Sequence, residues 1–357
     1  MTANSGHATL QTPGLVDGHI HPDKTAWGGA WLSRRPGETL QQLIDNDLAT
    51  QFSFDRSVED RAYALFANAL ANGTLGMRAH VDVSPELGLA NIEGVRAAAE
   101  RLAPELTVQI VAFPQFGLLT NPGTLEVMDA ALDAGADLVG GIDPGGLEGD
   151  LHGHLDAIFG LADRKGRDLD IHLHDGGEDG LAQIREIARR TVAGGRQGRV
   201  TIGHAFALCD HSLPSLERTL DIVAEAGIWI ATCALGPDPV ADPALFEKHG
   251  VRLVAGSDGV RDAWSPFGTG SMVDRVHLLA YRTGAITDAE LERAFRIAST
   301  AGGELLGIDD LATWSPESGT RLEFAAENIA QLVVDRPAPL RVLRAGVDAR
   351  SAHPDLP

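Results

Sequence analysis

The histidines of this chain are spaced as ligands for a metal ion. His19 and His21 form a His-x-His pair, and alternate residues of a strand share a face, so both rings can point at one ion. Three further candidates, His172, His204 and Asp258, follow later in the chain. A His-x-His pair alone is a weak signal, but with these residues it predicts a site of imidazole and carboxylate ligands. Such ligands suit Zn²⁺ and Fe²⁺ alike.

The elements that must position these residues alternate between β-rich runs and amphipathic helical stretches. In the helical stretches apolar residues recur at i, i+3, i+4 and i+7, and several stretches end in glycine. The predicted strands are Leu15–His21, Thr74–Val83, Thr107–Gln115, Leu138–Asp143, Leu169–Asp175, Val200–Ala205, Ile228–Ala234 and Arg252–Asp258. Eight such units favour an α/β fold of the (β/α)₈ TIM-barrel type over an open doubly wound sheet.

Polar residues gather at one end of these strands. The residues at or just beyond the predicted carboxyl ends are His19, His21, Gln115, His172, Asp175, His204 and Asp258. In a TIM barrel this rim is where active sites are built. The placement therefore predicts an active site assembled from several strands.

The chain divides into one large unit and a small tail. We assign residues 12–320 to the barrel, in which Met272–Arg282 and Asp288–Leu306 are predicted helices. Asn328–Val334 and Leu340–Ala345 are predicted as short strands, so residues 321–350 would form a short C-terminal β remnant. Residues 1–11 are expected to be flexible.

Composition narrows the classes of function. The 357 residues include 29 Lys and Arg against 50 Asp and Glu, a formal net charge of −21. This charge argues against binding to nucleic-acid phosphates or to an anionic membrane, since both need a basic surface. No apolar run approaches the ~20 residues of a membrane span, no signal peptide is visible at the amino terminus, and two cysteines make no disulfide framework. We expect a cytoplasmic enzyme without nucleic-acid or membrane partners, either as a monomer or as a homo-oligomer.

Three longer motifs carry a resemblance to a known family. They are Arg78–Val83 (RAHVDV), Gln109–Gln115 (QIVAFPQ) and Asp262–Gly268 (DAWSPFG). Together with the histidine pattern they resemble the amidohydrolase superfamily, and within it the branch of cytosine deaminase and isopropylammelide hydrolase-like enzymes. The likeness extends from about Gly14 to Ile329.

This resemblance implies a role for each candidate. One divalent cation, Zn²⁺ or Fe²⁺, would be bound by His19, His21, His172 and Asp258. His204 would orient the attacking hydroxide, while Asp258 would also accept a proton. Asp175 stands where the family has a proton-shuttling glutamate, and Gln115 would hydrogen-bond the substrate.

Four residues allow two interpretations each. Asp143 either bridges a second metal or lines the pocket, and lining is favoured because Asp143 stands before a Pro-Gly-Gly turn. Trp264 is either a pocket wall or a plug under the rim. His174 shares the strand face of His172 and is the alternative ligand. Lys24 lies on a loop that either covers the substrate or packs against the barrel.

Three departures from the family pattern affect the prediction. Asp175 is one methylene shorter than the usual glutamate, and Gly259 stands where cytosine deaminase has a second aspartate. About fourteen residues precede the first strand, so the β-sandwich of the family is expected to be reduced or absent.

The combined prediction is a metal-dependent hydrolase of a C–N bond in a small, neutral nitrogen heterocycle. Deamination of an amino-pyrimidine, purine or triazine ring by a metal-bound hydroxide is placed first because of the resemblance. The alternatives are ring opening of a cyclic amide and a non-catalytic protein that binds a metal or ligand.

Overall fold

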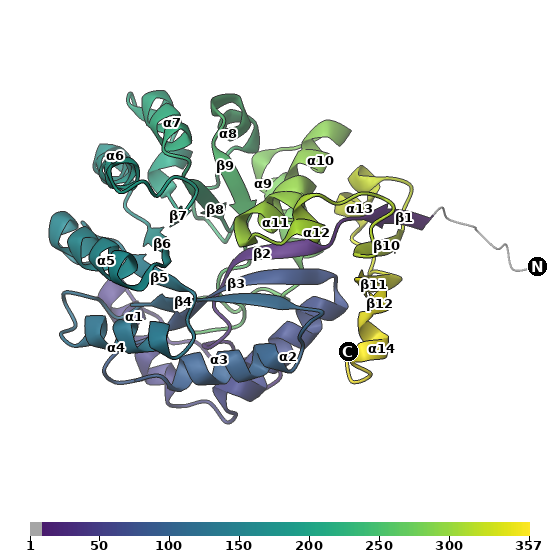
Figure 1. Cartoon of the computed structure of the whole chain (residues 1–357), viewed down its shortest axis with the longest axis horizontal. Helices are drawn as coiled ribbons and strands as arrows, with labels where there is room; N and C mark the ends of the chain where they lie inside the picture. Colours follow the sequence, from purple (N-terminus) through teal and green to yellow (C-terminus); the bar gives the residue numbers. More distant parts are fainter. Residues whose placement is uncertain (1–8) are drawn as a thin grey trace, which may run out of the picture.

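The computed structural model describes residues 9–357, and within them eight parallel strands form a barrel (Figure 1). The strands are β2 (Leu15–Ile20), β3 (Thr74–Asp82), β4 (Thr107–Phe113), β5 (Leu138–Ile142), β6 (Asp168–Leu173), β7 (Val200–His204), β8 (Trp229–Thr232) and β9 (Arg252–Ala255). Each strand pairs with its successor, and a bridge between Ile20 and Asp258 closes the circle. The predicted (β/α)₈ fold is confirmed.

Helices surround the strands, as expected for parallel strands that are buried on both faces. They are α2 (Val58–Ala71), α3 (Ala90–Glu100), α4 (Thr124–Asp133), α5 (Leu151–Lys165), α6 (Gly177–Ala193), α7 (Leu216–Glu225), α8 (Pro243–His249) and α9 (Met272–Thr283). Local signals set their ends: Ser57 and Asp150 accept hydrogen bonds from the first turns of α2 and α5. Gly166 ends α5 in the left-handed conformation. No helix in the described part of the chain has the length and apolar character needed to cross a bilayer.

Further helices lie outside this repeating pattern. A helix that precedes α2, α1 (Leu40–Gln51), lies in the connection from β2 to β3, and a short 3₁₀ helix, η1 (Phe206–Cys209), follows β7. After α9 come α10 (Asp288–Ile297), α11 (Thr300–Leu306) and α12 (Asp309–Ala312). The single helix predicted over Asp288–Leu306 is wrong, because the chain leaves helical geometry at Ser299, which has φ −134° and ψ −98°.

A small antiparallel sheet packs beside the barrel, so the expected reduced β appendage is present (Figure 1). Its order is β1 (Thr9–Thr12), β10 (Arg321–Ala325), β11 (Arg341–Arg344) and β12 (Val347–Asp348). Of the segment expected to be flexible, residues 1–8 lie outside the described residues. Thr9–Gln11 correct that expectation, because their backbone pairs with β10.

The segment predicted as a strand over Asn328–Val334 is instead helix α13 (Ile329–Asp335). Its first turn is capped by Asn328, whose side chain accepts a hydrogen bond from the backbone N–H of Gln331. An amino-terminal cap of this kind outweighs the strand preference of two adjacent valines. The chain ends with α14 (Ala349–Ala352).

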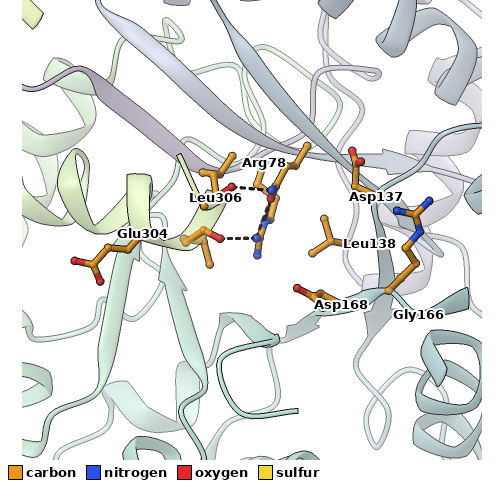
Figure 2. Close-up of a pocket in the computed structure, with 11 residues that line it drawn as sticks. Arg78, Asp137, Leu138, Gly166, Asp168, Glu304 and Leu306 are labelled. Carbon is orange, nitrogen blue, oxygen red and sulfur yellow. Dashed lines mark hydrogen bonds between the residues drawn. The ribbon is translucent and has the colours of Figure 1, made fainter. Parts of the chain in front are cut away.

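A polar pocket of about 380 Å³ opens at the amino-terminal end of the barrel (Figure 2). Its inner wall includes Arg78 of β3, whose guanidinium donates to Gln109, Asp170, Thr201 and the carbonyl of Leu305. These hydrogen bonds occupy the guanidinium of Arg78 and close the amino-terminal end of the barrel. The predicted active-site residues lie at the opposite, carboxyl end of the strands.

Candidate active site and metal centre

Three histidines and one aspartate meet at the carboxyl end of the barrel. His19 and His21 belong to the end of β2, His172 to β6, and Asp258 follows β9. The Nε2 atoms of His21 and His172 lie 3.2 Å apart, and Oδ1 of Asp258 lies 3.2 Å from Nε2 of His21 and 3.8 Å from Nε2 of His19. The structure therefore brings together all four ligands predicted from the sequence.

The chemistry of this cluster fits a divalent cation. His19, His21 and His172 are buried, and neither ring nitrogen of His19 has a hydrogen-bond partner among the described residues. Burial lowers the pKa of His19 and His172 well below the ordinary value and that of His21 to about 3. The rings are thus neutral, and their lone pairs are available. Buried acceptors without partners are costly, and a cation bound by imidazole and carboxylate would satisfy them.

Two glycines make room for His19. A Cβ at Gly256 would lie 2.5 Å from the Cβ of His19, and a Cβ at Gly203 would lie 2.8 Å from its Cε1. Both distances are too short for a real contact. The glycines that precede the site residues His204 and Asp258 are therefore required by the close approach of His19.

His204 lies beside the four candidate ligands but makes none of the shortest contacts among them. Its Nε2 lies 3.9 Å from Oδ2 of Asp258, and burial together with the nearby His174 lowers its pKa to about 4. His204, Asp258 and Asp143 have positive φ angles of 65°, 57° and 32°. Non-glycine residues rarely adopt this conformation, which recurs at functional sites. This backbone conformation sets the direction of the three side chains at the ends of the strands.

His174 and Asp143 form a hydrogen-bonded pair at the rim. Asp143 Oδ2 lies 2.8 Å from Nδ1 of His174, and its Oδ1 accepts the backbone N–H of the same residue. Desolvation opposes a charge on His174, whose side chain is 39% exposed, but the attraction of Asp143 outweighs it and raises the pKa of His174. Asp143 thus lines the pocket, and its carboxylate orients a histidine.

Asp175 is the one predicted catalytic residue that the structure does not bring to the cavity. Its Oδ2 accepts hydrogen bonds of 2.8 Å from the backbone N–H of Gly146 and from Nε2 of Gln183. Among the described residues, those that line the cavity include Asp143 and His174 but not Asp175. Its carboxylate therefore holds the loop after β5.

Lys24 is buried within a group of carboxylates. Its Nζ lies 3.4 Å from Oδ2 of Asp47 and 3.4 Å from Oδ2 of Asp82, and it donates to Oε1 of Gln115. Burial alone would lower the pKa of Lys24, but the aspartates outweigh burial and raise it. The residue is therefore a fixed cation that is tied to the predicted substrate-binding glutamine.

A buried polar column runs below the site. Asp170 receives the guanidinium of Arg78 and lies 3.2 Å from Nε2 of His80, whose ring centroid is 4.1 Å from that of His19. His80 therefore pairs with Asp170, while Asp82 contacts Lys24. The column supports the ligand cluster from the barrel interior.

One cavity of about 460 Å³ joins these parts. Its polar lining includes His21, Asp258, His204, His174, Gln115 and Lys24. Trp264 also lines it, with its indole N–H donating to Asp47 at 2.8 Å. Apolar side chains of α1 and of the loops complete the walls, so the cavity suits a small, mostly apolar ring with a few polar atoms.

Sequence reasoning did not assign two elements of this site. The sequence indicates His174 only as an alternative ligand, although its i+2 spacing from His172 places it at the rim. Asp47 lies in a helix whose other polar residues are exposed or half-buried, and no motif includes it. Its role becomes visible only where α1 meets Lys24 and Trp264 in space.

The sequence model of the amidohydrolase family matches residues 55–321, which is more than half of the chain. This protein belongs to the amidohydrolase family. The His-x-His pair lies before the matched region, so the assignment of His19 and His21 as candidate ligands rests on the geometry described above.

Two relatives are similar over nearly their whole length. N-isopropylammelide isopropyl amidohydrolase of Pseudomonas sp. (strain ADP) is 31% identical over 349 residues, which cover 94% of this chain and 85% of the relative. The crystal structure of N-isopropylammelide isopropylaminohydrolase from Burkholderia multivorans ATCC 17616 matches with a TM-score of 0.91 and 36% identity, over 98% of this chain and 90% of that one. A structure of 5-methylcytosine deaminase from Klebsiella pneumoniae has a TM-score of 0.83 at 23% identity, over 98% and 89% of the chains, and shares the fold.

Proposed function

We propose that this protein is a cytoplasmic hydrolase that uses one divalent cation, Zn²⁺ or Fe²⁺, to cleave an exocyclic C–N bond of a small, neutral nitrogen heterocycle. The observation that carries the proposal is that His21 and Asp258 of the candidate ligand cluster line the same cavity as the His174–Asp143 pair. Two relatives, 31% and 36% identical, carry names of hydrolases of N-isopropylammelide, which supports this class of substrate.

Each residue of the cluster has a role in this reaction. His19, His21, His172 and Asp258 would hold the cation. A divalent cation, when bound, lowers the pKa of water and polarises the atom it contacts. Asp258, with His204 beside it, is placed to orient the attacking water and accept its proton.

The leaving nitrogen needs a proton from a group that lines the cavity. His174, whose pKa is raised by Asp143, would deliver this proton from its imidazolium form. The water oxygen ends on the ring carbon, the exocyclic C–N bond breaks with its electron pair on nitrogen, and ammonia or an amine leaves with the added proton. Asp143 keeps the imidazole in one orientation throughout.

Gln115 and Lys24 provide recognition of the ring. An amide side chain can donate and accept hydrogen bonds, which suits the alternating N–H and C=O edge of an amino-heterocycle. The ammonium of Lys24 donates to Oε1 of Gln115 and so fixes the orientation of this amide.

A substrate screen tests the reaction. We expect purified, metal-loaded protein to release ammonia or alkylamine from at least one ring in a panel of N-alkylammelides, amino-pyrimidines, amino-purines and amino-pterins. A parallel panel of cyclic amides is followed by loss of ring absorbance. Turnover confined to cyclic amides would replace the proposal with ring-opening chemistry, and no turnover on either panel would favour a binding protein.

Metal analysis tests the ligand set separately. Protein purified without added metal should contain about one equivalent of Zn or Fe, and His21→Ala should lose most of it. His204→Gln should retain the metal and lose turnover. Two equivalents in the wild type, or unchanged metal content in His21→Ala, would refute the single four-ligand site.

A further inference from the structure

Helix α1 is an addition to the barrel that closes one side of the cavity. It lies between β2 and the barrel helix α2, and its amino end is capped by Thr39. A helix that docks on a barrel normally buries an apolar stripe. Among the described residues of α1, the buried ones are Ile44 and Asp47. One of the two side chains that attach α1 to the barrel is therefore a carboxylate.

Asp47 connects α1 to two residues of the active site. Its Oδ2 accepts a 2.8 Å hydrogen bond from Nε1 of Trp264 and lies 3.4 Å from Nζ of Lys24. The residue is 1% exposed, and its Oδ1 has no partner among residues 9–357. Removing one partner from such a buried pair is strongly destabilising, since the other charge remains buried.

The next helical turn extends this polar contact. Gln51, four residues after Asp47, donates to Oδ2 of Asp82 at 3.0 Å and accepts from Nδ2 of Asn91 at 3.3 Å. Residues spaced i and i+4 lie on one side of a helix. One side of α1 therefore contributes to and contacts the cluster of aspartates that surrounds Lys24.

Other side chains of α1 face the cavity. Leu40, Leu43 and Ile44 line the same 460 Å³ cavity as His174 and Asp258. The segment before the helix is tied to the Trp264 loop as well, because Arg34 donates to the carbonyl of Ala263 at 2.9 Å. The polar anchor of α1 thus holds an apolar wall in place.

We propose that Asp47 is a positioning residue that fixes α1 as the apolar wall of the substrate pocket, and that it does so through Lys24 and Trp264. The wall would select rings that carry an apolar group. This inference rests on the proposed function for the identity of the ligand, whereas the docking of α1 stands on contacts within the chain.

Hydrogen exchange tests the docking without any substrate. Asp47→Asn keeps the size and one acceptor but removes the charge, and we expect exchange of residues 40–51 to rise roughly tenfold, the effect of losing a hydrogen bond to a charged group. Asp45→Asn is the matched control, because Asp45 is on the exposed side of the same helix. Equal exchange in Asp47→Asn, Asp45→Asn and wild type would overturn the proposal, even if the protein showed no hydrolase activity.

Kinetics test the wall. On the most active ring of the screen, Asp47→Asn should raise KM roughly tenfold with a smaller change in kcat, since the metal ligands and His174 are untouched. Leu43→Ala should raise KM for an alkyl-bearing ring more than for its unsubstituted analogue, with exchange of α1 unchanged. Equal losses for both rings, or a fall in kcat alone, would contradict the assignment.

A second variant covers the case in which Asp47→Asn does not fold. Trp264→Phe keeps the aromatic ring and removes the donor to Asp47. It should likewise raise the exchange of residues 40–51, while residues 107–113 of β4 keep wild-type protection. Unchanged exchange of α1 in this variant would count against the anchor.

Discussion

Single side chains in this site are driven toward opposite charge states by their surroundings. Burial keeps His19, His21 and His172 neutral, whereas the carboxylate of Asp143 raises the pKa of His174. Neutral imidazoles can donate lone pairs to a cation, and a charged imidazole can donate a proton. Groups whose pKa values are separated in this way commonly divide acid and base roles.

This division predicts that His174, rather than Asp175, carries the proton to the leaving nitrogen. His174→Gln and Asp143→Asn should each lower kcat by ~10² or more with unchanged metal content. Asp175→Asn should have a smaller effect, because that carboxylate bonds Gly146 and Gln183 outside the cavity. His152→Gln, at an exposed histidine of α5, is the control. A larger loss of kcat in Asp175→Asn than in His174→Gln would restore Asp175 as the shuttle.

Asp262 predicts a pH dependence of stability. Burial, helped by the nearby Asp47, raises its pKa from 3.8 to about 7. The folded state then holds a proton that the unfolded chain releases, so this contribution to stability is complete below about pH 4 and is lost as the pH rises through 7. Asp262→Asn removes the titration, and its free energy of unfolding relative to wild type should increase from pH 5 to pH 8. Urea titrations at these two pH values measure this difference, and a parallel pH dependence in both proteins would contradict the assignment.

At the scale of the elements, the sequence predicts the strands and helices of the barrel well, but it predicts the segments outside the repeating barrel units, such as α1 and α13, poorly. A short apolar run such as LVGGI of β5 matches a buried parallel strand, because composition and burial agree there. The prediction for the C-terminal segment fails because two local signals compete there. Val333 and Val334 favour a strand, yet the cap formed by Asn328 starts helix α13. The ligands follow from strand ends, whereas Asp47 depends on a contact between α1 and a loop more than 200 residues away.

The cap of α13 makes this competition testable. The side-chain oxygen of Asn328 accepts a 2.8 Å bond from the N–H of Gln331. Asn328→Ala should lower the free energy of unfolding by ~1 kcal/mol, the usual loss for such a cap. Asn328→Asp keeps the acceptor and should stay near wild type in thermal denaturation. Equal stability of all three proteins would show that packing alone holds the helix.

At the scale of the whole molecule, three of the proposed metal ligands, His19, His21 and Asp258, lie where the barrel closes. β2 and the segment after β9 meet through a 2.7 Å hydrogen bond from the Asp258 N–H to the His19 carbonyl. We call this junction between β2 and the segment after β9 the seam of the barrel. Asp17 strengthens the seam, since its Oδ1 accepts hydrogen bonds from the backbone N–H groups of His19 and Ser257. A cation held by His19, His21 and Asp258 would tie the first strand to the last, and His172 would tie both to β6.

Removal of the metal should therefore loosen the seam before the rest of the barrel. Chelation should lower the Tm, because a ligand present at 100 times its Kd contributes about 2.7 kcal/mol to stability. Hydrogen exchange should rise more in residues 15–21 and 252–258 than in β4, and added Zn²⁺ should restore both measurements. His21→Ala should resemble the chelated protein and gain nothing from Zn²⁺. An unchanged Tm, or exchange that rises equally in β4 and at the seam, would mean that the cation serves the reaction without holding the barrel closed.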